Sequence, residues 1–521
     1  MVMRVTQQTL YGSVIRQNNA SLAKLMETNN QASTQKRINA PSDDPNGAVQ
    51  VLGTRTDISQ LTQYKANSDT AQGWLNQADS TLSSVSTLIT SIKSNAEQAA
   101  TGTVTAENRG EIASAVRQYF EQLISMANTT YNGQSLFAGQ KTGSEAYSMG
   151  LGLTSNDATF TSALDDLPAP GYTISGDTDS TVLVQFTDTT TPDQPAFRYT
   201  TDGGTTWQTG SYASPSPSTD TETLQLGGVS MTLSHAALNS VTPSSSTDDA
   251  NGTWLWVRPT AYYQGNNNDD VSVTYTGTSG VTATAAGTFS GNVQVKITDA
   301  PAGGPYTYSY STDGGSTWVD NNTSGTDATG NPALSVPGGI LTLDETLGTP
   351  AVGDQFLIQP STANISIGIS PTDSVVVNGV GKDIFGGMYQ TKASNASTTS
   401  YNTAATFDGS VSGNLFETVG KLVGYLETNN QGGIQECLDD LTTSQNQVLM
   451  TAASVGAKEN RVTSAQNMVT TLAENATTTL SKVEDADLTT LITKLSEQEL
   501  AYQAVLKSSS MVMNLSLVSY I

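Results

Sequence analysis

Residues 61–99 read LTQYKANSDTAQGWLNQADSTLSSVSTLITSIKSNAEQA, and the spacing of the apolar and small residues in this stretch decides the fold class. These residues recur in two rows with a period of seven. The first row is Leu61, Ser68, Leu75, Leu82, Ile89 and Ala96. The second row is Tyr64, Ala71, Ala78, Val85, Ile92 and Ala99. Two such rows put a narrow apolar seam along one face of a long helix, which predicts lengthwise packing against a second helix.

The C-terminal part of the chain carries a matching seam. Its positions are Ile434, Leu438, Leu441, Gln445, Val448, Ala452, Val455, Val462, Val469, Ala473, Ala476, Leu480 and Val483. At about 1.5 Å per residue, this seam predicts a rod roughly 75 Å long. Gly102 ends the earlier helix, and four-three spacing predicts a further helix over 112–126. We therefore expect the inner helices 58–99, 112–126 and 434–483 to form an antiparallel bundle.

The two extremities, residues 5–35 and 488–521, carry seams that polar residues interrupt. Asn18 and Asn29 occupy seam positions, and a buried Asn costs stability while fixing register and partner number. Chain ends are also the parts hardest to keep ordered. We predict that these segments pack against neighbouring copies, the alternative being a core within one molecule. The expected assembly residues are Tyr11, Ile15, Leu22, Leu25, Leu488, Ile492, Leu495, Leu500, Tyr502, Leu506, Met513 and Leu517.

Between residues 141 and 405 the composition shifts to Thr, Ser, Gly, Asp and Pro, and short alternating runs such as VLVQF (182–186) predict β-strands. This region is internally duplicated. FRYTTDGGTTW (197–207) recurs as YSYSTDGGSTW (308–318), a shift of 111 residues, and LQLGGVSMTL (224–233) recurs as LSVPGGILTL (334–343). Repetition of this kind indicates two copies of one β module.

TTDGGTTW and STDGGSTW resemble the Asp-box, in which an aspartate closes a hairpin turn, glycine takes positive φ and tryptophan packs beneath. The residues in these roles are Asp202 and Trp207 in the first copy and Asp313 and Trp318 in the second. Because the motif is structural wherever it recurs, it predicts hairpins rather than a catalytic site.

These patterns predict an α+β multidomain protein. A long antiparallel helical bundle or coiled coil is built from both termini, and it encloses an inserted β-rich region of two duplicated modules. The expected divisions are an N-terminal assembly helix (1–40), a helical core in two parts (41–140 and 411–484), a connection (141–170), β modules (171–280 and 281–372), a return segment (373–410) and a C-terminal assembly helix (485–521).

Composition excludes several classes of function. The 521 residues include 22 basic and 47 acidic ones, and a formal net charge of −25 disfavours nucleic acid and membrane surfaces as partners. Cys437 and His235 are the single cysteine and histidine, so no intrachain disulfide or cysteine-rich metal site can form. No P-loop, nucleophile elbow or nucleotide fingerprint is present. We expect a protein without enzymatic activity, cofactor or metal.

Two aspartate pairs have the composition of a possible site. Asp43 and Asp44 are flanked by Pro41, Pro45 and Gly47, which favours a capped turn between helices over an acid/base or metal pair. Asp269–Asp270 lacks EF-hand spacing, which favours a solvated loop over a Ca²⁺ site. No apolar run approaches the ~20 residues of a membrane span, and MVMRVTQQTLYGSV lacks the pattern of a Sec-type signal.

The helical ends resemble the flagellin-like family. RINAPSDDPNGA (37–48) is similar to its N-terminal signature, with Arg37, Asp43, Asp44 and Pro45 as the signature turn, and the DDP variant is typical of the hook-associated protein 3 branch. YNGQSLFAG (131–139), VVVNGVGKDIFGG (375–387), VGAKENRV (455–462), KVEDADL (482–488), QAVL (503–506) and MNLSLVSYI (513–521) resemble further segments of that branch. Residues 34–36 read Thr-Gln-Lys where the family has Ser-Gly.

The resemblance implies a structural subunit of the bacterial flagellum, located outside the cell at the hook–filament junction. Such subunits form a ring of copies between the first hook-associated protein and flagellin. They are exported unfolded through the flagellar type III channel, after a cytoplasmic chaperone has held the C-terminal helix. Two other functions remain open: a flagellin-type filament subunit, and a surface glycan-binding or adhesive protein that acts through the β modules.

Overall fold

The computed structural model describes residues 7–165, 172–217, 220–249, 251–266, 271–287, 289–327, 330–360, 362–391, 400–402 and 413–518. It divides into two compact units. The terminal unit comprises Met1–Thr70, Gly368–Ser374 and Arg461–Ile521, and the central unit comprises Ala71–Ile367 and Val375–Asn460. None of the described helices combines the length and the apolarity that a membrane crossing requires.

The helices account for both ends of the chain. They are α1 (Gln7–Thr34), α2 (Pro45–Ala99), α3 (Ala106–Ala127), α4 (Ala158–Asp165), α5 (His235–Leu238), α6 (Gly381–Phe385), α7 (Leu415–Glu427), α8 (Gln431–Glu484) and α9 (Leu488–Val518). The long helices and the antiparallel sheets between them confirm the predicted α+β multidomain class.

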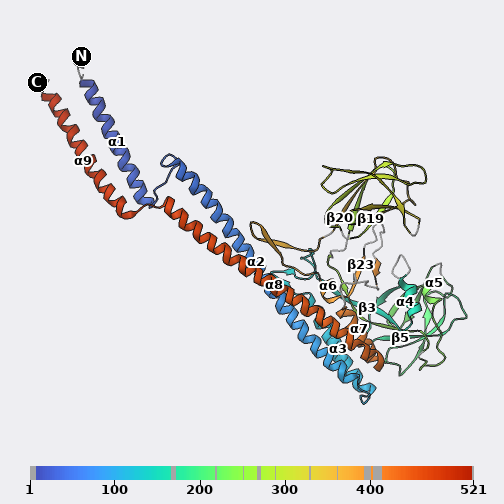
Figure 1. Ribbon diagram of the computed structural model, residues 1–521. Coiled ribbons are helices and arrows are strands. Elements are labelled where there is room, and N and C mark those ends of the chain that lie inside the picture. Colours follow the sequence, from blue (N-terminus) through green and yellow to red (C-terminus); the bar gives the residue numbers. More distant parts are fainter. Residues whose placement is uncertain are drawn as a thin grey trace. The chain divides into compact units, whose positions relative to one another are not determined.

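The two longest helices, α2 and α8, lie side by side and antiparallel (Figure 1). In the central unit, Lys93 Nζ donates to Thr442 Oγ1 over 2.8 Å, and Gln445 Nε2 donates to Thr90 Oγ1 over 3.0 Å. The predicted seam of α2 is buried throughout the central unit, from Ala71 to Ala99. Seven-residue spacing therefore predicted the buried face of this helix correctly, because each seam side chain returns to the same face after two turns.

Helices α3 and α7 complete the helical part of the central unit. The rings of Phe120 and Phe416 meet edge to face, with centroids 5.8 Å apart. Arg117 Nη2 lies 2.9 Å from Glu427 Oε1. The Asn414 side chain caps α7 by accepting a hydrogen bond from Glu417 N over 3.1 Å. The break between α7 and α8 was not predicted from the sequence, although an Asn cap before an apolar run is a helix-start signal.

The first β module consists of two facing sheets. Its strands are β3 (Tyr147–Ser155), β4 (Tyr172–Gly176), β5 (Val182–Asp188), β6 (Ala196–Thr200), β7 (Gln208–Thr209), β8 (Ser211–Tyr212), β9 (Thr221–Leu226), β10 (Val229–Ser234) and β11 (Trp254–Tyr263). One sheet has the order β4-β10-β9-β8. The other has the order β24 (Ser400–Asn402), β23 (Met388–Thr391), β11, β5, β6 and β7, and β3 also pairs with β11.

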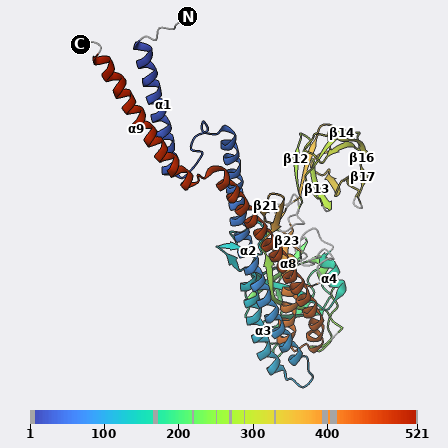
Figure 2. The ribbon, with the colours of Figure 1, turned by 60° about the vertical axis from the view of Figure 1, so that its left-hand side comes forward.

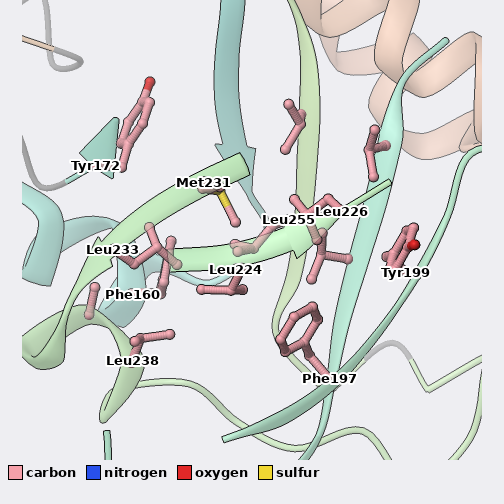
Figure 3. Close-up of a cluster of buried hydrophobic side chains, with 14 of the residues drawn as sticks. Phe160, Tyr172, Phe197, Tyr199, Leu224, Leu226, Met231, Leu233, Leu238 and Leu255 are labelled. Carbon is pink, nitrogen blue, oxygen red and sulfur yellow. The ribbon is translucent and has the colours of Figure 1, made fainter. Parts of the chain in front are cut away.

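A buried apolar cluster lies between these two sheets (Figure 3). Leu255 comes from β11, Phe197 from β6, and Leu224 from β9. Phe160 of α4 and Leu238 of α5 close one end of the cluster. The alternation of buried and less buried residues along β9 and β10 is the period-two pattern of strands with one face on a core.

The second β module repeats this arrangement. Its strands are β12 (Val271–Thr276), β13 (Thr282–Gly287), β14 (Val293–Asp299), β15 (Thr307–Ser311), β16 (Val319–Thr323), β17 (Gly325–Thr326), β18 (Pro332–Val336), β19 (Gly339–Asp344) and β20 (Gln355–Pro360). They form sheets of order β12-β20-β14-β15-β16 and β13-β19-β18-β17. Their apolar cluster draws all its residues from 271–358.

Strand pairing shows where each duplicated copy begins and ends. β3 pairs with β11, and β12 pairs in the same way with β20, so the first strand of each copy lies beside its last. The copies therefore span 147–263 and 271–360, and not 171–280 and 281–372 as the sequence suggested. Val271–Thr276 belongs to the second copy, because its whole length pairs with Gln355–Pro360.

A buried ion pair fastens the first module to the helices. Arg258 of β11 is 1% exposed, and its Nη2 lies 2.5 Å from Glu417 Oε2 on α7. Burial opposes both charges, yet attraction between them raises the pKa of Arg258 and lowers that of Glu417. Thr260 also donates to Glu417. Removing one partner would leave an uncompensated buried charge, so this strand and this helix are held as one body.

The remaining strands are short. They are β1 (Thr130–Tyr131), β2 (Gln134–Ser135), β21 (Ser366–Ser370), β22 (Asp373–Val376), β23 (Met388–Thr391) and β24 (Ser400–Asn402). In the terminal unit, Asn67 Nδ2 donates to Gly368 O over 2.9 Å, and Arg461 Nε donates to Asp373 Oδ2 over 3.1 Å. The turn between β21 and β22 is thereby attached to α2 and α8.

We predict that the second module can be removed without unfolding the rest. A Cβ placed at Gly139 would lie 2.8 Å from Asn266 O and 3.0 Å from Ala363 Cβ, so the two segments that flank this module pass the same point. Replacing 271–360 by a short Gly/Ser linker should leave the thermal melting of the helical circular dichroism signal within about 5 °C of the full chain, since the core of the module packs on itself.

The matched control is Leu255→Asp in the first module, at a position that is fully buried between the two sheets. This variant should lose its cooperative transition, because an unpaired charge cannot be buried there. Collapse of the helical signal on excising 271–360 would contradict the independence of the second module.

Candidate functional site

Helices α1 and α9 lie side by side in the terminal unit (Figure 2). Along α9, buried and half-buried residues recur at four-three spacing and form an inner row of Leu491, Leu495, Gln498, Tyr502, Val505 and Ser509. The matching inner row of α1 is Tyr11, Val14, Asn18, Ser21, Leu25 and Thr28. These rows form a short heptad seam within one chain, so the two extremities pair with each other.

A second set of apolar residues on the same helices stays uncovered. The outer row comprises Ile15, Leu22 and Met26 on α1, and Leu488, Ile492, Leu500, Leu506 and Met511 on α9. Leu500 is 69% exposed and Ile492 is 54% exposed. Large apolar side chains in such numbers on two neighbouring helices are typical of a surface that another protein covers.

The predicted assembly residues thus fall into two groups. Tyr11, Leu25, Leu495 and Tyr502 lie in the inner row. Six more are exposed and belong to the outer row: Ile15, Leu22, Leu488, Ile492, Leu500 and Leu506. The side chains of Met513 and Leu517, and the pair Asp269–Asp270, lie outside the described residues.

The inner seam is weakly packed. Asn18 Oδ1 is buried, and no hydrogen-bond partner for it lies within the described part of the chain. A buried polar atom left without a partner costs roughly 1–3 kcal/mol. Ser21 and Ser509 occupy further inner positions where larger apolar residues would bury more surface. The pair α1–α9 therefore holds little stability of its own.

At the base of this helix pair the α1–α2 turn lies against the α8–α9 turn. We call this contact, formed by Gln35, Lys36 and Arg37 with Glu484 and Ala486, the hinge. Gln35 ends α1 with a φ of 57°, a left-handed conformation typical of a helix end. Arg37 N donates to Glu484 O over 2.6 Å, and Ala486 N donates to Gln35 O over 3.0 Å. These backbone bonds tie the α1–α2 turn to the α8–α9 turn.

The Glu484 carboxylate is the ionic centre of the hinge. Its side chain is only 4% exposed, and Lys36 Nζ lies 2.5 Å from Oε1. Arg55 of α2 donates through Nη2 to the same oxygen and through Nε to Oε2 over 3.3 Å. Burial alone would raise the pKa of Glu484, but the hydrogen bonds and charges of Lys36 and Arg55 lower it below its ordinary value. The carboxylate therefore stays charged and joins residues from both turns.

The signature turn packs directly against this centre. Arg37 donates to Val483 O through Nε over 3.2 Å and through Nη2 over 2.8 Å, and its Nη1 lies 3.7 Å from Asp44 Oδ2. Asp43 Oδ2 accepts from Asn39 N and Ala40 N over 2.9 and 2.8 Å, and these backbone bonds, that of Ala40 first, lower the pKa of Asp43. Both aspartate roles are thus structural.

Asp44 and Pro45 begin α2. Asp44 Oδ1 accepts from Gly47 N over 3.0 Å, and proline at the first helical position lacks an N–H that would otherwise be unsatisfied. Gly47 has no room for a side chain, since an added Cβ would lie 2.5 Å from Ile38 Cδ1. Beneath the turn, Leu480 and Val483 of α8 pack against a small buried cluster of Ile38, Ala48 and Val51.

The sequence pattern predicted part of this hinge. It singled out Arg37, Asp43, Asp44 and Pro45. Asp487 caps the start of α9, since its Oδ1 accepts from Thr489 N over 2.9 Å. The sequence pattern did not identify Glu484, Lys36 or Arg55 as a cluster. Glu484 lies inside the quoted segment KVEDADL, but its burial depends on a cation more than 400 residues away in the chain.

The Asp-box residues lie in the central unit, where they close turns after β6 and β15. Asp202 accepts from Thr206 N over 2.8 Å and from Thr206 Oγ1 over 2.5 Å. The Thr206 side chain first, then its N–H, lower the pKa of Asp202 to about 2. Asp313 makes the same bonds with Thr317, which lower its pKa to about 2 as well.

We predict that Glu484→Gln loosens the hinge. The amide keeps the shape of the side chain but removes the charge that Lys36 and Arg55 share, a loss of roughly 1–3 kcal/mol for hydrogen bonds to a charged group. Amide hydrogen exchange at Arg37 and Ala486 should become about tenfold faster or more. Glu474→Gln on the same helix is the control, because that carboxylate is exposed and no partner for it lies within the described residues.

The same carboxylate predicts an acid dependence. Since the folded-state pKa of Glu484 lies below its ordinary value of 4.5, its contribution is complete above about pH 4.5 and is lost as the pH falls through the lowered pKa. Exchange at Arg37 and Ala486, corrected for intrinsic rates, should rise below pH 4.5 in the wild type and much less in Glu484→Gln. An equal rise in exchange below pH 4.5 in both proteins would contradict the role of Glu484 as the ionic centre of the hinge.

The N-terminal helical part of the chain is similar to known proteins. Residues 5–142 match the family model described as the bacterial flagellin N-terminal helical region. Flagellar hook-associated protein 3 of Escherichia coli K12 is 33% identical over 147 residues, which cover 28% of this chain and 46% of that protein. The Salmonella typhimurium protein of that name is 31% identical over 151 residues, which cover 29% and 48%.

The chain thus spans about half the length of these curated relatives. Among solved structures, FlgL of Xanthomonas campestris aligns over 81% of this chain and 98% of its own, with 14% identity and a TM-score of 0.29. The sequence relatives confirm the resemblance drawn from the signature segments. Residues 5–142 are thus similar to the N-terminal helical region of the bacterial flagellins, and the chain is similar to flagellar hook-associated protein 3 over 28–29% of its length.

Proposed function

We propose that this chain is a structural subunit of the bacterial flagellum and acts as the adaptor at the hook–filament junction. The observation that carries the proposal is the uncovered outer row on α1 and α9. Eight large apolar side chains there remain exposed in a single chain. Similarity to hook-associated protein 3 over about 150 residues supports the same function. No enzymatic role is part of this proposal.

The mechanism is assembly by burial. The inner seam of α1 and α9 contains Asn18, Ser21 and Ser509, so it stabilises the pair only weakly. Stacked copies would cover the outer row. Each Å² of apolar surface removed from water in this way would stabilise the assembly by about 25 cal/mol. Ordering of the extremities is thereby coupled to assembly, which keeps single chains from locking into a competing arrangement.

The hinge has a definite task in this mechanism. Glu484, Lys36 and Arg55 join the α1–α9 pair to the ends of α2 and α8. Side chains that pack between copies can transmit force only if the helices that carry them are fixed at their base. An ionic contact supplemented by two backbone bonds provides this fixation without a large apolar core.

The partners follow from this role. We propose a ring of copies with the first hook-associated protein on one side and flagellin on the other. Before export, a cytoplasmic chaperone would cover α9, whose exposed residues include Leu500 and Leu506. The protein would leave the cell through the flagellar type III channel and act outside the cell, in the flagellum.

A flagellin-type filament subunit is the second candidate, and the match of residues 5–142 to the flagellin N-terminal helical region favours it. Copy number separates the two functions, because a filament contains very many subunits and a junction contains few. Antibody to the second β module, applied to intact flagella, should label only the boundary between hook and filament. Labelling along the whole filament would contradict the junction adaptor and favour a filament subunit.

We predict that Leu500→Glu, alone or with Leu506→Glu, abolishes incorporation into flagella. Both side chains are exposed in the single chain, so the substitutions should leave its thermal unfolding unchanged while placing charge in the contact between copies. The measurement is filament attachment and motility in cells that lack the wild-type protein.

Gln503→Glu provides the matched control, since it adds the same charge to the same helix at an exposed position that carries no apolar side chain. This variant should assemble. Normal filaments with Leu500→Glu would remove the outer row from the proposed interface.

A further inference from the structure

An open pocket of about 310 Å³ lies in the central unit, where β11 meets the turn between α7 and α8. Trp254 and Trp256 line it, together with Asn156, Asp248, Thr428 and Asn430. The two tryptophans are two residues apart on one strand, so their side chains share a face of the sheet. Leu255 between them points the opposite way, into the core between the sheets (Figure 3).

The aromatic rings of this pocket form a continuous set. The ring centroids of Trp254 and Trp256 are 6.2 Å apart, with 21° between the planes. Trp207, from the first Asp-box, meets Trp254 edge to face at 6.2 Å, and Tyr425 of α7 meets Trp256 edge to face at 5.5 Å. Tyr425 and α7 cover Trp256, which is 5% exposed, whereas Trp254 remains half-buried at the rim.

Hydrogen bonds fix the orientation of both indoles. Trp254 Nε1 donates to Asp249 O over 2.8 Å, and Trp256 Nε1 donates to Thr428 Oγ1 over 2.9 Å. Asn156 holds the strand from the other side, because its Oδ1 accepts from Trp254 N over 2.8 Å. The ring of Trp254 is therefore held rigidly, and binding a ligand there would cost little conformational entropy.

Two side chains beside this ring have polar groups without a partner among the described residues. No hydrogen bond to the Asp248 carboxylate occurs within the part of the chain that the structure describes. Asn430 Oδ1 accepts from Gly433 N over 3.0 Å, which leaves its amide N–H groups without a partner among the described residues. A carboxylate acceptor and an amide donor are thus available beside an aromatic ring.

The duplication shows that the fold does not require this arrangement. Val184 of β5 pairs with Leu255, and Val295 of β14 pairs with Phe356, so β11 and β20 are equivalent strands. Gln355 and Leu357 of the second copy therefore stand where the first copy has Trp254 and Trp256. Trp318 also contacts no aromatic ring among the described residues. The packing of α7 accounts for Trp256 in the first copy, but not for Trp254.

We propose that this pocket binds an uncharged carbohydrate, with a pyranose ring stacked on Trp254. A pyranose presents a face of C–H groups bordered by hydroxyls, and it matches an aromatic ring flanked by Asp248 and Asn430. Anionic sugars are disfavoured, because Asp248 is acidic and the chain carries a net charge of −25. The nearby Arg198 guanidinium is already paired within the chain. It donates to Gln185 Oε1 over 2.8 and 2.6 Å and lies 5.2 Å from the Trp207 ring.

The test uses the full chain on an array of oligosaccharides. The neutral set contains glucose, galactose, mannose and N-acetylhexosamine oligomers, and the anionic set contains sialylated and uronate-containing ones. We expect binding to members of the neutral set only. The best neutral probe is then titrated by calorimetry. Trp254→Ala should weaken its affinity at least tenfold, and Trp318→Ala should leave it unchanged.

Asp248→Ala distinguishes loss of binding from loss of folding, because that side chain contributes no described hydrogen bond to the fold. It should retain the wild-type circular dichroism spectrum and weaken binding severalfold. The proposal is overturned if no neutral oligosaccharide binds at millimolar concentration. It is also overturned if Trp254→Ala and Asp248→Ala both bind as the wild type does, or if anionic oligosaccharides bind as well as neutral ones.

Discussion

The charged contact of Glu484 with Lys36 and Arg55 is the constraint on which the terminal unit depends. Helices α1 and α9 share an inner seam that contains Asn18, and this seam cannot by itself position the pair. Backbone bonds at Arg37 and Ala486 bring the two turns together, and the carboxylate then links a residue of the first turn to a residue of α2. A buried carboxylate with a single cation would be costly, whereas two cations and an adjacent backbone pairing offset its desolvation.

Placing the specific interaction at the base of the helix pair leaves the helices themselves available for other contacts. If the outer row, which includes Leu500 and Ile492, were buried within one chain, no apolar surface of these helices would remain for a neighbour to cover. The polar inner positions leave α1 and α9 only weakly paired in the free chain, so that in the proposed assembly the contacts with a neighbouring copy would complete their order. Stability is concentrated instead in the pairing of α2 with α8, where the seam of α2 is fully buried in the central unit.

The sequence predicted those parts of the fold whose signal is local or periodic. The heptads of α2, the helix after Gly102 and the turn at Asp43–Asp44 depend on neighbouring residues, and they were found. The duplication was found as well, but its boundaries were misplaced, because pairing of β3 with β11 and of β12 with β20 joins residues about 100 positions apart. Six of the eight outer-row residues were among the predicted assembly residues, but the separation of an outer from an inner row was not predicted, because that depends on how α1 and α9 face each other.

The two β modules show how one duplicated fold can acquire different relations to the rest of a chain. Both keep the same strand order and an apolar cluster between two sheets, so the core is the conserved requirement of the fold. The first copy places Arg258 and Trp256 on the outer face of β11, where Glu417 and Tyr425 of α7 bind them. The equivalent face of β20 carries Gln355 and Leu357 and makes no such contact among the described residues. Attachment to the helices thus depends on the residues that β11 carries on its outer face. On the same face α7 leaves Trp254 only half-buried, and the open pocket lies beside this ring.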